Sequence, residues 1–196
     1  MLEINVVIFY ITNRINGGTI LDFIRLEKNM IDVMKEEQVK LGYTSETVRL
    51  YYPILSLNRL LNTDLNVDQM HAALKVFRDI VGDKLGKISV SNRGERFCFT
   101  IPPQGVDYVH AHMDSTEFIC DFVGTIAKHG TIDDVLQQFH KHSNRVHVEE
   151  IPNGEFHYLV YFEDGVPDNF RYCITNEDGH INYHRFTIED YTDLLV

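Results

Sequence analysis

The sequence has few cysteines and no long apolar run. Its three cysteines, Cys98, Cys120 and Cys173, stand far apart without a CxxC pair, so neither a zinc knuckle nor a disulfide framework is indicated. No apolar run reaches the roughly 18–20 residues of a membrane span. The first residues also lack the basic flank and small-residue cleavage site of a signal peptide. These absences predict a cytoplasmic protein that does not enter a membrane.

Motifs that identify enzyme classes are missing as well. The sequence has no GxSxG, no P-loop, no HExxH and no GxGxxG after a strand, which excludes the catalytic families that those motifs define. It therefore predicts no catalytic residue, no resident metal and no cofactor. The leading interpretation is a protein that is not an enzyme.

The formal charge of −11 is concentrated in the second half of the chain. Residues 25–112 carry 12 basic and 11 acidic side chains, whereas residues 113–196 carry 5 and 16. Nine of the ten histidines lie between His110 and His184. Two halves of such different composition predict two domains, at residues 25–113 and 114–196.

Residues 1–24 are predicted to be an extension outside both domains. Met1–Ile20 is a β-prone apolar run followed by a polar, glycine-containing stretch, with no partner segment nearby. The pair Gly17-Gly18 can be encoded by a purine-rich ribosome-binding sequence, and Leu21 by a TTG start codon. One hypothesis is that translation begins at Leu21, and the alternative is an ordinary N-terminal edge strand. The nucleotide sequence distinguishes the two.

The first domain begins with three helical patterns. Arg25–Leu41 has apolar residues at helical spacing. The second pattern covers Glu46–Tyr51 and Pro53–Leu61, with a kink or break because a proline disfavours helical geometry in the residue before it. The third helix begins at Asn66, which with Gln69 has the spacing of a capping box.

A β-hairpin is predicted to follow these helices. Lys87–Ser91 and Arg96–Ile101 alternate as strands around a turn at Asn92–Glu95. Pro102-Pro103 then ends the pairing ahead of a closing helix. This order of elements is typical of a winged helix.

Winged helices that bind DNA place the third helix in the major groove and the hairpin, or wing, against the backbone. The residues for those roles are Lys75, Arg78, Arg93 and Arg96. Affinity for nucleic acid comes largely from neutralising phosphates, and the near-neutral first domain is joined to a strongly acidic one. DNA binding is therefore the alternative to a winged helix that contacts protein or has a purely architectural role.

The second domain is predicted to be α+β. Helices are expected near Thr116–Lys128 and Ile132–His142. Four alternating runs joined by turn sequences then predict an antiparallel meander, ending in a short helix capped by Thr187. The runs are Val146–Ile151, Phe156–Phe162, Phe170–Thr175 and His180–Phe186.

Alternation assigns the residues of these four strands to two faces. The apolar face should pack on the two helices and contains Val146, Val148, Phe156, Tyr158, Val160, Phe162, Phe170, Tyr172, Ile174, Ile181 and Tyr183. The opposite face collects His147, Glu149, His157, Tyr161, Arg171, Cys173, His180 and His184. Imidazoles with a carboxylate can bind a divalent metal, yet none of the spacings is a metal motif. We interpret this face as solvated or partner-facing, with metal or small-ligand binding as the alternative.

Several stretches resemble a bacterial family described only as a domain of unknown function. They are Met34–Tyr43, Val48–Pro53, the hairpin with Arg96–Cys98, Glu155–Phe162 and Arg171–Ile174. The likeness covers about Leu26–Tyr191. Because the family has no assigned activity, the resemblance implies no catalytic residue and no ligand.

Three functional hypotheses follow from the sequence. The first is a non-enzymatic cytoplasmic regulatory or assembly protein that contacts a protein partner or a second copy of itself. The second is a transcription regulator that binds DNA through the winged helix. The third is a metalloprotein, small-ligand-binding protein or enzyme that uses the outer face of the C-terminal sheet.

Overall fold

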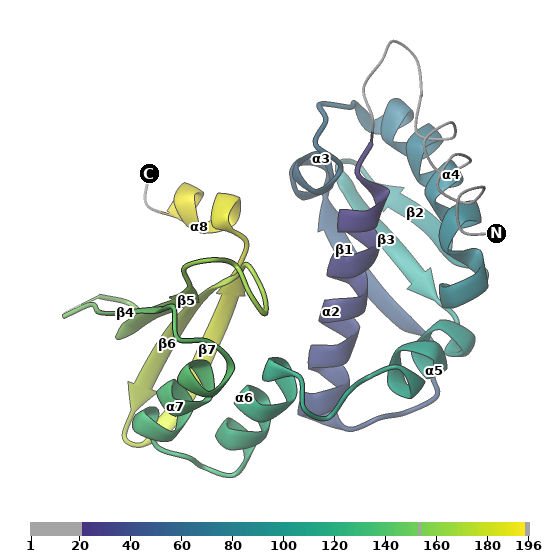
Figure 1. Cartoon of the computed structure of the whole chain (residues 1–196). Helices are drawn as coiled ribbons and strands as arrows, with labels where there is room; N and C mark the ends of the chain where they lie inside the picture. Colours follow the sequence, from purple (N-terminus) through teal and green to yellow (C-terminus); the bar gives the residue numbers. More distant parts are fainter. Residues whose placement is uncertain (1–20, 153, 195–196) are drawn as a thin grey trace. The chain divides into compact units, whose positions relative to one another are not determined.

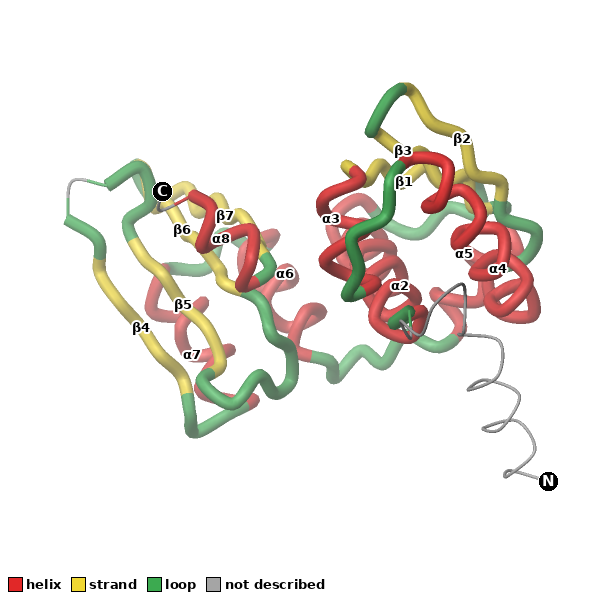
Figure 2. The backbone as a smooth tube through the Cα atoms, turned by 90° about the horizontal axis from the view of Figure 1, so that it is seen from above, coloured by secondary structure: helices red, strands yellow, loops and turns green. Residues whose placement is uncertain are grey.

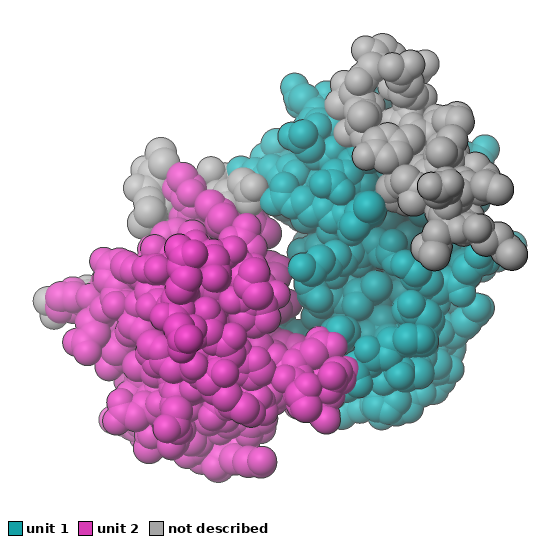
Figure 3. All heavy atoms as spheres, viewed as in Figure 1, with its two compact units in different colours: residues 1–38, 42–113 teal, residues 39–41, 114–196 magenta. Residues whose placement is uncertain are grey.

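The computed structural model describes residues 21–152 and 154–194, which divide into two compact units (Figure 3). Of the described residues, unit 1 comprises those up to Gln38 and Gly42–Met113, and unit 2 comprises Val39–Leu41 and those from Asp114 onward. Each unit contains helices and an antiparallel sheet, so the fold class is α+β. The hypothesis of a translation start at Leu21 concerns residues outside the described part of the chain.

Unit 1 consists of helices and a three-stranded sheet (Figure 1). In chain order its elements are α2 (Phe23–Leu41), β1 (Val48–Pro53), α3 (Ile54–Leu61), α4 (Val67–Leu85), β2 (Ser89–Arg93), β3 (Arg96–Ile101) and α5 (Pro103–Ala111). The strand order is β1-β3-β2, and both pairings are antiparallel. β3, the last strand of unit 1 in the sequence, is therefore the central strand of this sheet.

Helix α2 begins at Phe23, two residues before the predicted start at Arg25. Asp22 is its N-cap, because a carboxylate oxygen of Asp22 accepts the backbone N–H of Arg25 at 2.9 Å. Leu21 and Phe23 are buried in the core of unit 1. Residues 21–24 are thus part of this unit.

The predicted helix at Glu46–Tyr51 is wrong, because most of this segment forms strand β1. β1 pairs with β3 along its whole length. Leu50 and Tyr52 point into the core, whereas Arg49 and Tyr51 are exposed, which is the period of two that a strand requires. Aromatic and β-branched residues favour this conformation, and the pairing with β3 stabilises it.

The capping box predicted for α4 is present. The side chain of Asn66 accepts the backbone N–H of Gln69, and the side chain of Gln69 accepts that of Asn66, each at 3.0 Å. After α4, the hairpin of β2 and β3 turns at Gly94, whose φ of 59° lies in the left-handed region that favours glycine. Local sequence signals therefore determine where α4 begins and where the hairpin of β2 and β3 turns.

The core of unit 1 lies between its helices and one face of the sheet. The ring of Phe77 on α4 lies 5.7 Å from that of Phe23 on α2 and 6.4 Å from that of Phe99 on β3. Phe97, Phe99 and Ile101 of β3 are fully buried. One face of the sheet is therefore covered by α2 and α4, and Figure 2 shows both helices on the same side of the strands.

Unit 2 contains a four-stranded sheet and three helices. Its elements are α6 (Phe118–Ala127), α7 (Ile132–His142), β4 (Val146–Glu150), β5 (Tyr158–Phe162), β6 (Arg171–Glu177), β7 (His180–Phe186) and α8 (Ile188–Leu194). The strand order is β4-β5-β6-β7, each strand antiparallel to the next. Within the described residues of both units, no helix is long and apolar enough to cross a membrane.

The apolar face of this sheet packs on α6 and α7, as predicted for most of its residues. Val160, Phe162, Tyr172 and Ile174 are buried with Phe122 and Phe139, and Val146, Tyr158, Phe170, Ile181 and Tyr183 pack against this cluster. Val148 lies opposite Val160 on this face, as predicted, but it is 37% exposed on the edge strand β4 and does not join the packed cluster. The face assignment is wrong for Phe156, whose ring lies 5.7 Å from that of His184 on the opposite face. Phe156 precedes β5, so strand alternation does not govern its direction.

Candidate functional site

The outer face of the unit 1 sheet forms an open, basic depression. Its volume is about 700 Å³, and the lining residues are Arg49, Tyr51, Ser91, Asn92, Arg93, Arg96, Cys98 and Thr100. We call this surface the basic sheet face. Register explains its composition, because Arg49 lies opposite Thr100, Tyr51 opposite Cys98, and Arg93 opposite Arg96. Side chains that alternate with the buried core residues must point outward together.

Among the described residues, no ion pair neutralises the positive charge on this face. Arg49, Arg93 and Arg96 are all exposed, and none of the lining residues that the structure describes carries a carboxylate. The ion pairs among the described residues do not include these arginines. Arg93 and Arg96 are cross-strand neighbours, and like charges placed opposite one another are unfavourable. A bound anion would relieve that repulsion.

An exposed aromatic ring lies among these arginines. Tyr51 is 53% exposed, and the guanidinium carbon of Arg96 lies 5.1 Å from the centroid of its ring. Ser91 and Thr100 add hydroxyl groups that can donate or accept hydrogen bonds. The basic sheet face therefore offers charge, a flat apolar ring and neutral polar groups.

Contacts beneath the sheet hold the strands that carry this face. The hydroxyl of Tyr52 donates to the side-chain oxygen of Asn29 at 2.9 Å, which ties β1 to α2. On β2, Nε2 of His71 lies 2.8 Å from the side-chain oxygen of Asn92, which ties the hairpin to α4. The amide of Asn92 also donates to the backbone oxygen of Gly94 in the turn at 2.8 Å. The face is thus supported on both edge strands.

The four residues predicted to contact DNA fall into two groups. The structure brings Arg93 and Arg96 together on the basic sheet face. Lys75 and Arg78 instead belong to α4, the helix that packs on the opposite, buried face of the sheet through Phe77.

Arg49 and Tyr51 were not among the predicted site residues. They lie in the segment that was interpreted as a helix, and a helical interpretation gives them no shared direction with the hairpin. The signal that identifies them is the alternation in Val48–Tyr52, where apolar and exposed side chains alternate.

The histidine-rich face of the unit 2 sheet has a different character. The His147 ring stacks on that of Tyr161 with centroids 4.6 Å apart, and the Arg171 guanidinium lies 3.7 Å from the Tyr161 centroid. Nε2 of His147 lies 3.5 Å from a carboxylate oxygen of Glu149. These four predicted residues form one group.

The remaining histidines of that face lie apart from this group. Nδ1 of His157 accepts the backbone N–H of Asn176 at 2.9 Å, His184 packs between aromatic rings, and His180 is exposed at the start of β7. In residues 21–152 and 154–194, no group of three His, Cys, Asp or Glu side chains is arranged to hold a metal ion. The arrangement does not support the metal-binding alternative.

The centre of this second face is closed rather than solvated. Leu159 and Cys173, neighbours across β5 and β6, are buried. Burial raises the pKa of the Cys173 thiol to about 11, which keeps it protonated and unreactive at neutral pH. Burial, followed by the nearby Cys173 and Glu149, raises the pKa of Tyr191 on α8. We therefore take the basic sheet face, not this face, as the candidate site.

Comparison with known proteins identifies a family. Residues 23–195 match the family described as "Domain of unknown function, E. rectale Gene description (DUF3877)". The chain belongs to this family. The match confirms the resemblance to a bacterial family of unknown function, and it includes every residue of the basic sheet face. No curated protein and no solved structure matches this DUF3877 chain.

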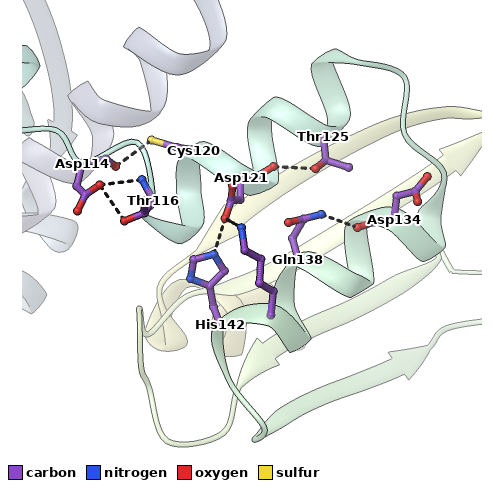
Figure 4. A network of polar contacts seen from close by, with 9 residues as sticks. Asp114, Thr116, Cys120, Asp121, Thr125, Asp134, Gln138 and His142 are labelled. Atoms are coloured by element: carbon purple, nitrogen blue, oxygen red, sulfur yellow. Dashed lines mark hydrogen bonds and ion pairs between the residues drawn. The ribbon is translucent and has the colours of Figure 1, made fainter.

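A polar network in unit 2 of this DUF3877 chain joins α6 to α7 (Figure 4). A carboxylate oxygen of Asp121 accepts from Nζ of Lys141 at 2.6 Å and from Nε2 of His142 at 2.7 Å. The hydrogen bond from Lys141, followed by that from His142, lowers the pKa of Asp121 below its usual value. These hydrogen bonds hold α6 and α7 together.

Removing this carboxylate should make stability depend less on pH. A carboxyl group whose pKa is lower in the folded state stabilises above its unfolded pKa of about 3.9, and that contribution is lost as the pH falls through the folded value. Asp121→Asn is expected to lower the free energy of unfolding by about 1 kcal/mol at neutral pH. The difference from wild type should shrink below about pH 4.

Urea unfolding measured across this pH range tests the expectation. Asp178→Asn is the matched control, because Asp178 is exposed in the β6–β7 turn with a φ of 51°, a conformation that asparagine also tolerates. If Asp121→Asn lowers the free energy of unfolding equally at pH 7 and at about pH 3.5, the charge of Asp121 is not what stabilises the fold.

Proposed function

We propose that this chain is a non-enzymatic bacterial regulatory or assembly protein of the cytoplasm, which binds an anionic macromolecular partner on the basic sheet face. The observation that carries this proposal is the set of three exposed arginines, Arg49, Arg93 and Arg96, with no lining carboxylate among the described residues. In a protein of formal charge −11, such a face is a local exception. Arginine is also the cation best suited to interfaces, since its planar guanidinium binds carboxylate or phosphate through paired hydrogen bonds.

Unit 1 is, in this proposal, a winged-helix-like module. The order helix, strand, helix, helix, strand, strand, with β1 joined to the hairpin of β2 and β3, supports that description. Unit 2 would be an acidic module with a meander of four strands, for which the consecutive strand order is the support.

Electrostatics favours the sheet over α4 as the binding surface. Lys75 on α4 shares the exposed surface of that helix with Asp68, Asp79 and Asp83. Exposed charges farther apart than about 8 Å are largely screened at physiological salt, so the local charge matters more than the net charge of the chain. The outer face of the sheet carries several positively charged side chains, whereas α4 carries both positive and negative ones. Duplex recognition by α4 is therefore the weaker candidate.

Affinity purification of the full-length protein from native lysate tests the proposal. The double variant Arg49→Gln/Arg96→Gln should reduce recovery of the partner by at least about tenfold, since two charge-assisted contacts are lost. Lys128→Gln, an exposed substitution at the end of α6, is the control and should leave recovery unchanged. Equal recovery by all three proteins, or no recovered partner with wild type, would overturn the proposal.

A further inference from the structure

The dimensions of the basic sheet face limit what can bind it. Arg49 and Arg96 are separated by four residue positions along the strands, since Arg96 lies opposite Pro53. At about 3.4 Å per residue this is about 14 Å, and three strands spaced by about 4.8 Å make the face about 10 Å wide. Tyr51 lies between the two positively charged ends. The surface therefore spans a few units of a polyanion.

The chemistry of the face distinguishes among polyanions. The carboxylates of an acidic peptide would pair with the arginines, but they would not stack on the exposed ring of Tyr51. Duplex DNA presents phosphates but keeps the faces of its bases stacked inside the helix. Single-stranded nucleic acid presents both phosphates and free base faces, and proteins bind it through a positively charged groove with aromatic side chains on which bases stack.

We propose that the anionic partner of the basic sheet face is single-stranded nucleic acid. Its phosphates bind Arg49, Arg93 and Arg96, and a base stacks on the face of the Tyr51 ring opposite the Arg96 guanidinium, which lies over the ring. Ser91 and Thr100 supply hydrogen bonds that do not select a base. This inference rests on the proposed function, because it names the partner of the same face. It differs from DNA recognition by a winged helix, in which α4 would enter the major groove.

Fluorescence anisotropy with the full-length protein tests the inference. The probe is a labelled mixed-sequence oligonucleotide of about 12 nucleotides, within the range of known single-strand sites. It is compared with the same strand annealed to its complement and with labelled polyglutamate. The single strand should bind at least about tenfold more tightly than the duplex. Three phosphate contacts at about 0.7 each predict a log–log salt slope near −2, or roughly 15–20-fold weaker binding from about 50 to 200 mM salt.

Substitutions at Tyr51 separate stacking from charge. Tyr51→Ala should weaken binding of the single strand by about tenfold, within the range measured for loss of one stacked base. Tyr51→Phe retains the ring and should bind within about twofold of wild type. Because Tyr51 is 53% exposed, neither variant is expected to unfold unit 1, and circular dichroism verifies this. Equal affinities of the Ala and Phe variants would overturn the stacking role.

Charge variants complete the experiment. Arg49→Gln should reduce the salt slope by about 0.7, whereas Lys75→Gln on α4 should change neither slope nor affinity. Tighter binding of the duplex with dependence on Lys75 would overturn the inference in favour of α4. Binding of polyglutamate in preference to both nucleic acids, lost in Arg49→Gln/Arg96→Gln, would overturn the inference and leave the proposed function standing. Absence of binding to every probe would overturn the inference, and the lysate comparison then decides the proposed function by itself.

Discussion

Phe139→Ala is expected to destabilise unit 2 strongly. The ring of Phe139 is fully buried and lies within 5.5 Å, between centroids, of Phe118, Phe122, Phe162 and Tyr172. Truncation of a buried phenylalanine removes its transfer free energy and leaves a cavity, which costs about 3–5 kcal/mol. Against a typical domain stability of 5–15 kcal/mol, that is a large fraction.

Amide hydrogen exchange resolved by peptide measures this loss in unit 2 itself. Protection of the strands β5 and β6 should fall in Phe139→Ala, because their inner faces pack on the deleted ring. His140→Ala is the matched control, since His140 is the next residue of α7 and is exposed. The control should change stability by less than about 0.5 kcal/mol. A Phe139→Ala protein with unchanged protection in β5 and β6 would contradict the central position of this ring.

Gly105→Ala is expected to have the second-largest effect, in unit 1. A methyl group at Gly105 would lie 2.5 Å from the backbone oxygen of Leu85 and 2.7 Å from Cγ2 of Ile101. The backbone at the end of α4 cannot retreat as a flexible side chain would, so α5 must move away from it. Overpacking of this kind costs about 1–3 kcal/mol, and the backbone contact places the expected loss at about 2–3 kcal/mol.

Gly82→Ala gives a control of opposite sign in the same unit. Gly82 lies within α4, and an added methyl group meets nothing within 4 Å. Alanine in a helix interior is favoured over glycine by about 0.5–1 kcal/mol, so this variant should be more stable than wild type. Urea unfolding monitored by circular dichroism compares the two. Loss of stability in both variants would mean that the close approach at Gly105 is not the cause.

Elements encoded by local signals agree with the sequence predictions. The predicted capping box at Asn66–Gln69 is formed, and α7, which also begins with a capping box, spans Ile132–His142 as predicted. The four runs of the second half form four strands within a few residues of the predicted bounds. Caps, turns and periodicity act over fewer than about ten residues, so a single sequence contains what is needed to recognise them.

The candidate site was predicted only in part, for a physical reason. Arg93 and Arg96 face each other across a short turn, and their proximity follows from local pairing. Arg49 and Tyr51 reach the same face only because β1 pairs with β3, where their partners are Thr100 and Cys98. A strand at the edge of a sheet draws its stability from that partner, and sequence propensity alone did not distinguish Val48–Pro53 from a helix.

Composition and local pattern were enough to establish an α+β chain, most of its helices and strands, and an acidic second half. Long-range strand pairing and packing determined the rest. The register of three strands gathers the arginines and Tyr51 on one open face, while burial at Leu159 and Cys173 closes the histidine-rich face that the sequence had left open. The alternation of buried and exposed residues can be recognised from the local sequence. The residue on the neighbouring strand and the segments that cover a face depend on parts of the chain far away in the sequence.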